Sequence, residues 1–284
     1  MIKTEATSGR VVAISGAGTG IGQCTAVKFA ALGWQVAVGG RRVDRLADTV
    51  QLVKEAGGSC IAHALDVTDA DSVEEFFSAV ESQVGTVTAV VNNAAAARYG
   101  RLHDFEPHEI ASEIATKLTG SLYMTRRAVA AMVREGRAGD ILFISSLAGA
   151  QPWPMHLPYA AANAGVEHAA RTLRLELEGT GIRIGVVRCG ETLGTDFGTK
   201  ELESGRFLEA NELWFRRGQL RHTGLMTPDM VADAIVTAIT LPSTHQYDVL
   251  SVTPAAPVGD LPETFQGWMT AMAEKHLGAA EPAS

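Results

Sequence analysis

Four glycines stand close together, directly after a short apolar run near the start of the chain. The residues of this segment are Gly16, Ala17, Gly18, Thr19, Gly20, Ile21 and Gly22. Glycine lets the backbone turn tightly and approach a ligand closely. A segment of helical period follows at once, and the N-terminus of a helix directs free N–H groups and its positive dipole end at an anion. The pattern therefore predicts a loop that holds the pyrophosphate of a dinucleotide.

The spacing of Gly16, Gly20 and Gly22 resembles the glycine motif of the short-chain dehydrogenase/reductase family. Two later segments agree with this resemblance. The segment Asn92-Asn93-Ala94-Ala95 is similar to the family's Asn-Asn-Ala-Gly element, and Asp66-Val67 stands where the family contacts the adenine ring. The resemblance covers about residues 8 to 252. It implies an α/β Rossmann-type fold with a doubly wound, seven-stranded parallel sheet, and it places Asp66, Val67, Asn93 and Ala94 at a nicotinamide dinucleotide.

The end of the second predicted strand bears on the choice of cofactor. An acidic residue there would accept hydrogen bonds from the ribose 2′-OH of NAD. By the family's alignment Gly40 takes that place, and Arg41 and Arg42 follow it. A guanidinium group can bind a 2′-phosphate through two parallel hydrogen bonds. We therefore expect NADP(H) rather than NAD(H); the alternative is that both arginines are ordinary solvated charges at the start of a helix.

The resemblance also implies a catalytic group: a Tyr that exchanges the proton, a Ser that holds the substrate oxygen, a Lys four residues after the Tyr, and an Asn on the preceding long helix. Ser146 and Tyr159 match the first two, thirteen residues apart. The lysine position, however, is occupied by Asn163, and the asparagine position by Lys117. The two residue types have exchanged places.

This exchange matters because the family's lysine hydrogen-bonds the nicotinamide ribose and lowers the pKa of the tyrosine. Without a nearby cation, a tyrosine with a pKa of about 10 is ionised to only about one part in a thousand at pH 7. Three interpretations remain open. In the first, Lys117 reaches into the site of the missing ammonium and Asn163 binds the ribose, since Tyr159 and Asn163 share one helix face. In the second, the protein is a slow ketone or imine reductase in which neutral Tyr159 donates the proton. In the third, it binds NADP(H) without turnover, as a sensor or structural partner.

Residues on the substrate side follow from the same alignment. Gly190 and Thr192 are expected at the nicotinamide, with Cys189 in place of the family's Pro. Trp153, His156 and Trp214 are the substrate-wall residues that we expect, and the aromatic rings indicate an apolar, fairly bulky ligand. The same rings would equally serve to pack a flap or a subunit contact, and His156 is either a second proton donor or a loop histidine of no special role.

The candidate site residues must be positioned by strands and helices. Short apolar runs alternate along the chain with segments of helical period, which predicts successive βαβ units. The predicted strands are Arg10–Ser15, Gln35–Gly39, Ser59–Ala64, Val87–Val91, Asp140–Ser145, Ile182–Val187 and Asp248–Val252. The predicted helices are Ile21–Leu32, Asp44–Ala56, Asp71–Gln83, Pro107–Arg134, Tyr159–Glu178 and Pro228–Thr240. The strands are almost continuous apolar runs, as expected where helices cover both faces of a sheet.

Two segments depart from this alternation. Residues 195–226 are too long for a plain loop and are expected to form a helical flap over the carboxyl ends of the strands. The tail from about residue 254 is expected to hold a helix with Asp260 as its N-cap. Phe265, Trp268 and Met272 are spaced along one stripe of that helix. The stripe packs either on this chain or on a neighbouring subunit.

Composition narrows the function classes. The chain has 284 residues, 46% of them hydrophobic and 20% charged, which is typical of a globular domain, and we expect residues 1–284 to form one domain. Its formal net charge of −8 makes nucleic acid and membrane surfaces poor partners. Its cysteines and histidines match no metal-ligand spacing. We expect a cytoplasmic, nucleotide-binding oxidoreductase that acts on a carbonyl or alcohol carbon, and the family resemblance implies a homodimer or homotetramer.

Overall fold

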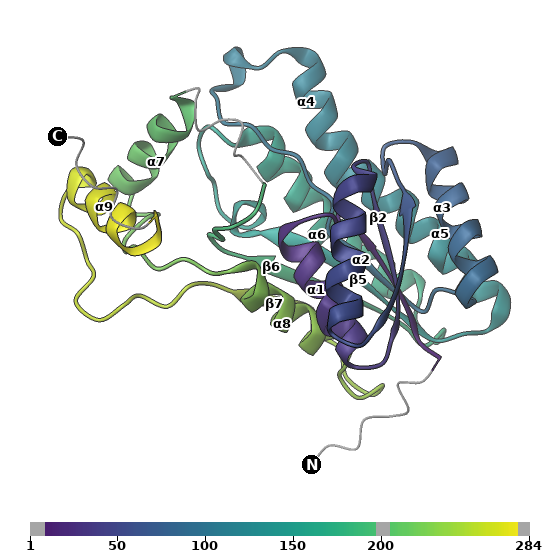
Figure 1. Cartoon of the computed structure of the whole chain (residues 1–284). Helices are drawn as coiled ribbons and strands as arrows, with labels where there is room; N and C mark the ends of the chain where they lie inside the picture. The colour runs from purple at the N-terminus through teal and green to yellow at the C-terminus, as the bar shows by residue number, and fades with distance from the viewer. Residues whose placement is uncertain (1–8, 197–204, 278–284) are drawn as a thin grey trace.

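Seven parallel strands form one sheet in the order β3-β2-β1-β4-β5-β6-β7 (Figure 1). The computed structural model describes residues 9–196 and 205–277. The strands are β1 (Val11–Ser15), β2 (Gln35–Gly40), β3 (Ser59–Ala64), β4 (Ala89–Asn92), β5 (Gly139–Ser146), β6 (Ile182–Cys189) and β7 (Val249–Val252). The order reverses between β1 and β4, so the crevice where doubly wound sheets bind ligands lies above the carboxyl ends of these two strands. The predicted fold class is confirmed, and the first and last residues of each predicted strand lie within two residues of the observed bounds.

Helices cover both faces of this sheet. On one face pack α1 (Gly20–Ala31), α2 (Val43–Glu55) and α8 (Pro228–Ile239), and on the other α3 (Ala70–Val84), α5 (Gly120–Glu135) and α6 (Leu157–Glu176). The first layer buries Phe29, Leu46 and Ile235 against the sheet, and the second buries Phe76 and Met124. Because both faces are covered, the strands carry apolar side chains at nearly every position, which explains the continuous runs in the sequence.

The helix predicted over Pro107–Arg134 is interrupted, and this part of the prediction is wrong. Helix α4 (Pro107–Ile114) leads into a π-helical turn at Ala115–Thr119, and α5 follows directly. A π turn inserts one additional residue, and the Ser121 hydroxyl donates a hydrogen bond of 2.7 Å to the Lys117 carbonyl there. Helical segments continue on both sides of this turn, so the sequence pattern was interpreted as one helix. Lys117 lies in this turn.

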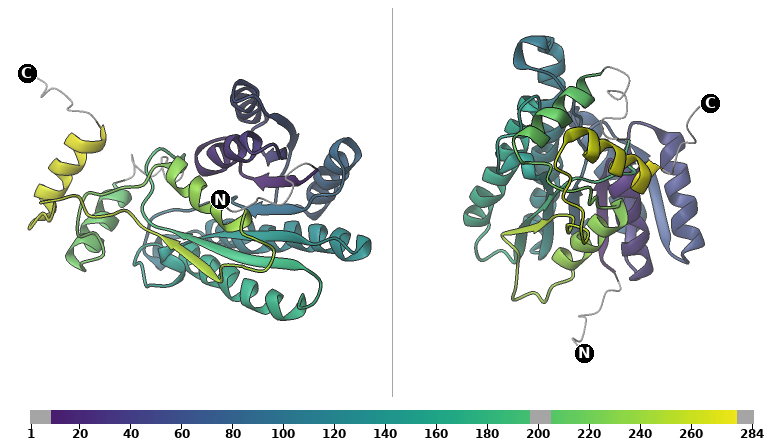
Figure 2. Two further views of the ribbon diagram at one scale, coloured as in Figure 1. Left: turned by 90° about the horizontal axis from the view of Figure 1, so that it is seen from below. Right: turned by 90° about the vertical axis from the view of Figure 1, so that its left-hand side faces the viewer.

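Helices α7 (Arg206–Arg216) and α9 (Phe265–Met272) stand to one side of the sheet (Figure 2). They belong to the flap and the tail expected from the sequence; residues 197–204 of the flap lie outside the described residues. Phe265, Trp268 and Met272 all pack in one aromatic cluster with Trp214 of α7. The stripe of the tail helix is thus covered by this chain, which is one of the two arrangements that the sequence allowed.

The N-cap expected for the tail helix is wrong. The helix begins after Thr264, whose hydroxyl accepts a hydrogen bond of 3.1 Å from the Gly267 N–H. Asp260 instead accepts hydrogen bonds from Thr223 and forms an ion pair of 3.2 Å with Lys275. The Asp260 carboxylate, which the local sequence pattern assigned to a helix cap, is therefore bound by residues that are distant in sequence. Within the described residues, no helix combines the length and the apolar character needed to cross a membrane.

Candidate active site

The glycine loop is held closely by the end of β4. Gly16 has φ +64°, and a Cβ atom there would lie 2.9 Å from the Cα of Ala94. A Cβ atom on Gly22 would lie 2.6 Å from the Gly16 carbonyl oxygen. The Asn93 amide nitrogen donates hydrogen bonds of 3.0 Å to the carbonyls of both Ser15 and Gly16. The loop therefore has no room for side chains at Gly16 and Gly22, and Asn93 and Ala94 pack directly against it.

The start of α1 is open to an anion. Its N-cap is Thr19, whose side chain makes no capping hydrogen bond, and no acidic residue stands in the first turn. The first N–H groups of a helix have no partner within it, so this end is suited to a phosphate. Gly20 lies beside Thr195, since a Cβ atom on this glycine would be 3.1 Å from the threonine methyl group. The segment after β6, which carries Gly190 and Thr192, thus reaches the glycine loop.

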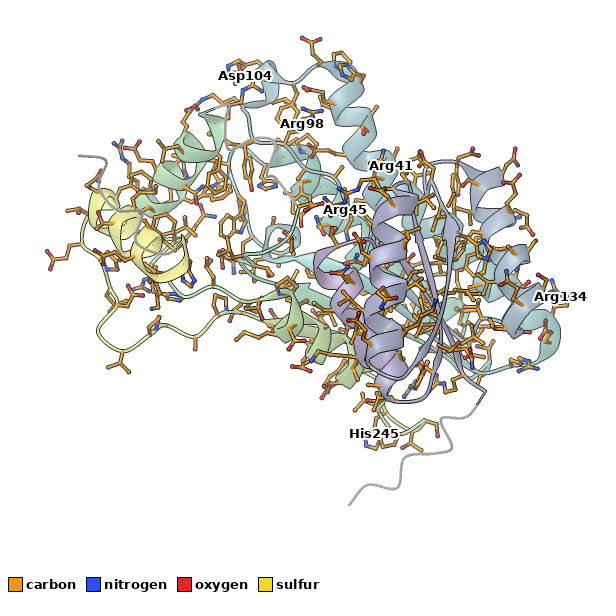
Figure 3. The ribbon with its side chains drawn as sticks, in the orientation of Figure 1. Arg41, Arg45, Arg98, Asp104, Arg134 and His245 are labelled. Atoms are coloured by element: carbon orange, nitrogen blue, oxygen red, sulfur yellow. The ribbon has the colours of Figure 1, made fainter. Side chains whose placement is uncertain are left out.

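Arginines gather near the expected adenosine end of the site. Figure 3 shows Arg41 and Arg45 near the upper end of α2, with His245 at the opposite end of the molecule. A Cβ atom on Gly18 would lie 2.9 Å from the Cβ of Arg45. Arg45, Gly18 and Thr19 line a surface depression of about 390 Å³. Arg42, by contrast, forms an ion pair of 2.7 Å with Asp196, so its guanidinium is already engaged.

Asp66 lies close enough to Arg41 for their charges to interact. Burial opposes ionisation of the Asp66 carboxyl, but hydrogen bonds from Thr68 and the nearby Arg41 charge outweigh it and lower its pKa. Val67 is buried and lies against Gly120, whose added Cβ would be 2.7 Å from a valine methyl group. Arg41 and Asp66, two of the residues expected to bind the cofactor, therefore lie close together.

Ser146 and Tyr159 come together at the end of β5 and the start of α6. The Ser146 hydroxyl accepts a hydrogen bond of 3.2 Å from the Ala148 N–H, which fixes its position at the strand end. Tyr159 is 9% exposed. Burial and the nearby Cys189 thiol raise the pKa of Tyr159 well above its ordinary value, against the opposing effect of hydrogen bonds with Ser146 and Asn163. The phenol is therefore neutral at physiological pH and suited to donate a proton.

Asn163 is fully buried one helical turn after Tyr159. Its amide nitrogen donates a hydrogen bond of 2.8 Å to the Tyr159 carbonyl. Its Oδ1 atom is buried and has no hydrogen-bond partner among the residues that the structure describes. A buried polar atom without a partner is costly, so this acceptor fits a hydroxyl group brought by a ligand, such as a ribose. This free acceptor and the uncapped N-terminus of α1 after the glycine loop show that the residues present fit a nicotinamide dinucleotide.

Lys117 points into the protein. It is only 2% exposed, and burial lowers its pKa to about 8. In the described part of the chain, no carboxylate lies within ion-pair distance of its ammonium. The charged or titratable neighbour that acts on it is Cys189, whose pKa burial raises to about 11 and Lys117 lowers. Since Cys189 also acts on Tyr159, the ammonium and the phenol share one neighbour at the end of β6.

The expected substrate-wall residues lie in the aromatic cluster above this group. The His156 ring stacks on Trp214 at 5.7 Å and lies 4.6 Å from the Tyr159 ring. Burial lowers the pKa of His156 to about 3, so the imidazole is neutral. Trp153 packs edge-on against Trp214 at 4.9 Å. Met155 lies between Trp153 and His156 in the sequence and has φ 63°. This backbone conformation is unusual for a residue with a side chain, and it tends to occur in functional loops.

Sequence reasoning missed two groups. Arg45 reaches the glycine loop only through the packing of α2. Glu167 is 3% exposed and binds Arg188 through hydrogen bonds of 2.9 and 2.6 Å, and it accepts another of 2.7 Å from Ser145. It stands one turn after Asn163 on the same face of α6, and that spacing was the available signal. The carboxylate joins α6 to the ends of β5 and β6, next to Ser146 and Cys189.

The family model for short chain dehydrogenases matches residues 10–205. The chain belongs to this family. Its match with the NADP-dependent 3-hydroxy acid dehydrogenase YdfG of Salmonella typhi is 30% identical over 246 residues, 86% of this chain and 94% of YdfG. The probable oxidoreductase EphD of Mycobacterium tuberculosis is 30% identical over 235 residues, and this short-chain dehydrogenase spans 39% of the length of EphD.

A solved structure extends this comparison to three dimensions. The closed form of serine dehydrogenase complexed with NADP⁺ superposes on this short-chain dehydrogenase with a TM-score of 0.75 at 28% identity. The match covers 88% of this chain and 97% of that one. A nicotinamide cofactor therefore agrees with both the geometry of the loop and a structural neighbour.

Proposed function

We propose that this short-chain dehydrogenase is an NADP(H)-dependent oxidoreductase that reduces a carbonyl group, or oxidises the corresponding alcohol, on an apolar small molecule. The observation that carries the proposal is the burial of Lys117 in a π turn of the helix before β5, where its charge acts on Cys189, a residue that also acts on Tyr159. A buried lysine without a carboxylate partner is costly, which supports a functional role for the charge.

Each polar side chain of the site has a separate role in the proposed reaction. NADPH, when bound, supplies the hydride. Ser146 and Tyr159 hold the substrate oxygen between two hydroxyl groups, and neutral Tyr159 donates the proton that the new alkoxide needs. Asn163 offers its unpartnered Oδ1 to a ribose hydroxyl. Lys117 supplies the positive charge that stabilises the tyrosinate left after proton transfer, in place of the lysine that the family carries at position 163.

Exchange of the two polar residues tests this assignment. Lys117→Ala should lower kcat at least a hundredfold, because the tyrosinate loses its compensating charge. Asn163→Ala should lower it less and should mainly raise the KM for NADPH. The double variant Lys117→Asn with Asn163→Lys restores the family's arrangement and should keep activity within about tenfold of the wild type, as expected when the charge rather than its helix matters. Equal tolerance of all three changes, with NADPH still bound, would refute the role of Lys117.

The preference for NADP(H) over NAD(H) is supported by glycine rather than an acid at position 40, by Arg45 beside the glycine loop and by Arg41 near Asp66. We assign the 2′-phosphate to these two arginines rather than to Arg42, which pairs with Asp196. Gly40→Asp should reverse the preference, because a carboxylate repels the phosphate and accepts from the NAD ribose. The ratio of kcat/KM for NADPH and NADH measures this, and a ratio unchanged by Gly40→Asp would refute the assignment.

Binding of NADP(H) without turnover is the second candidate. The raised pKa of Tyr159 favours it, since a phenol that does not ionise cannot act as the base for alcohol oxidation. Carbonyl reduction remains possible with a neutral phenol, so an assay in the reducing direction distinguishes the two. Tight NADPH binding with no oxidation of NADPH by any ketone would support the second candidate.

A homodimer or homotetramer is also part of the proposal. Large apolar side chains are exposed along α5 and α6, with Leu122 at 38%, Val133 at 53%, Leu157 at 51% and Leu175 at 72%. Exposed apolar patches on a helix pair are typical of subunit contacts. Light scattering at micromolar concentration measures the assembly, and a monomer would refute this part.

A further inference from the structure

The aromatic cluster over Tyr159 contains three tryptophans, and their indole N–H groups differ. Trp214 donates a hydrogen bond of 2.8 Å to the Pro154 carbonyl, and Trp268 donates one of 3.0 Å to the His222 carbonyl. Trp153 is only 9% exposed, and its buried Nε1 atom has no hydrogen-bond partner within the described ranges of the chain. Buried tryptophan N–H groups usually find an acceptor, so this one needs an explanation.

A second unpartnered group among the described residues lies on Gln219, which follows α7 and contacts the residue before Trp153. The amide nitrogen of Gln219 donates a hydrogen bond of 2.7 Å to the carbonyl of Pro152, the residue before Trp153. Its Oε1 atom is buried and also lacks a partner in the part of the chain that the structure describes. The wall of the cluster thus offers one donor and one acceptor, each held by ordered neighbours. A hydroxyl group is the simplest group that can accept from the first and donate to the second.

We propose that Trp153 and Gln219 determine substrate specificity by binding a second oxygen, best a hydroxyl group, on a ring-containing ketone. The inference rests on the proposed function, because it concerns the same substrate site. The rings of Trp153 and Trp214 contact the apolar body of the substrate, whose reacting carbonyl lies at Ser146 and Tyr159. The second oxygen lies away from that carbonyl, against the indole N–H. A site that hydrogen-bonds a substrate hydroxyl discriminates strongly against the analogue that lacks it.

Reduction of a matched ketone series tests this specificity. The probes are unsubstituted α-tetralone and its ring-hydroxylated and ring-methoxylated derivatives, with the substituent at each aromatic position in turn, and NADPH oxidation is followed by absorbance. At least one hydroxytetralone should be reduced with a kcat/KM at least tenfold above the value for the unsubstituted ketone. The matching methoxy compound should fall between them, since its oxygen can accept from Trp153 but cannot donate to Gln219.

Trp153→Phe keeps an aromatic ring and removes only the donor. It should reduce the preference for the oxygenated over the unsubstituted tetralone, measured as the ratio of their kcat/KM values, to less than about threefold. Trp34→Phe is the matched control, because the Nε1 of Trp34 is also buried without a described partner but the residue packs near Arg10, in the core between the sheet and α1. This variant should leave the preference unchanged. If Trp153→Phe does not fold, Gln219→Leu provides the test and should abolish the advantage of hydroxy over methoxy compounds.

The outcomes separate the two levels of the proposal. Tetralones reduced with no preference for an additional oxygen, or a Trp153→Phe variant that lowers kcat/KM equally for every compound, would overturn the specificity inference and leave the reductase intact. NADPH binding without reduction of any tetralone would overturn the specificity inference, and only the further finding that no other ketone oxidises NADPH would refute the proposed function.

Discussion

Replacement of Lys117 by Met should stabilise the protein at neutral pH while it abolishes activity. The side chain is 2% exposed, and burial lowers its pKa from the ordinary lysine value of 10.5 to about 8. Met has a similar length and no charge, so Lys117→Met removes the cost of burying the ammonium without leaving a large cavity. A functional residue that costs stability is expected where catalysis needs a charge in the interior.

The size and pH range of the effect follow from the pKa. Because the pKa in the folded state lies below that in the unfolded state, the folded protein binds fewer protons between about pH 8 and pH 10.5. The free energy of unfolding of the wild type therefore rises with pH across this window. One pKa unit corresponds to about 1.36 kcal/mol, so the variant should be more stable by about 3 kcal/mol at pH 7. This advantage should shrink above pH 8 and disappear near pH 10.5.

Urea unfolding of the cofactor-free protein at pH 6.5, 7.5, 8.5, 9.5 and 10.5 measures the difference. Lys54→Met is the matched control, because Lys54 is exposed on α2 and its loss should change stability by less than about 0.5 kcal/mol at each pH. A Lys117→Met variant less stable than the wild type at pH 7, or a difference that does not vary with pH, would show that the ammonium is not held in the interior.

Two further changes test the framework of the site. Glu167→Ala should lower the free energy of unfolding by about 3–5 kcal/mol, because Arg188 and Ser145 lose their buried carboxylate partner; Glu167→Gln should cost less, and thermal unfolding that shows a loss below about 1 kcal/mol for the alanine variant would contradict the argument. Gly22→Ala should weaken NADPH binding at least tenfold, because the added methyl group would lie 2.6 Å from the Gly16 carbonyl oxygen and displace the loop. Titration of NADPH fluorescence measures this, and an unchanged Kd would mean that the loop tolerates the shift.

Much of this molecule was predictable from local sequence. Strand formation follows from continuous apolar runs, and these marked all seven strands within two residues. The glycine loop was equally visible, because a tight turn and a close approach of Gly22 to Gly16 require the absence of a side chain at those positions. The family resemblance predicted Ser146 and Tyr159 as a pair, and the pair depends only on the end of β5 and the start of α6, which lie close in sequence.

Partners far apart in sequence could not be read in the same way. Arg42 pairs with Asp196, 154 residues away, and Asp260 bonds Thr223 instead of capping a helix. The π turn, the burial of Lys117 and the hydrogen bonds of Glu167 with Ser145 and Arg188 likewise depend on how helices pack on the sheet. The sequence by itself determined where the backbone turns and which residue types reach the carboxyl ends of the strands, because these follow from steric limits and periodicity over a few residues. Only the tertiary structure decided which charges are buried and which polar atoms lack a partner, because burial and pairing depend on segments that meet after the chain has folded.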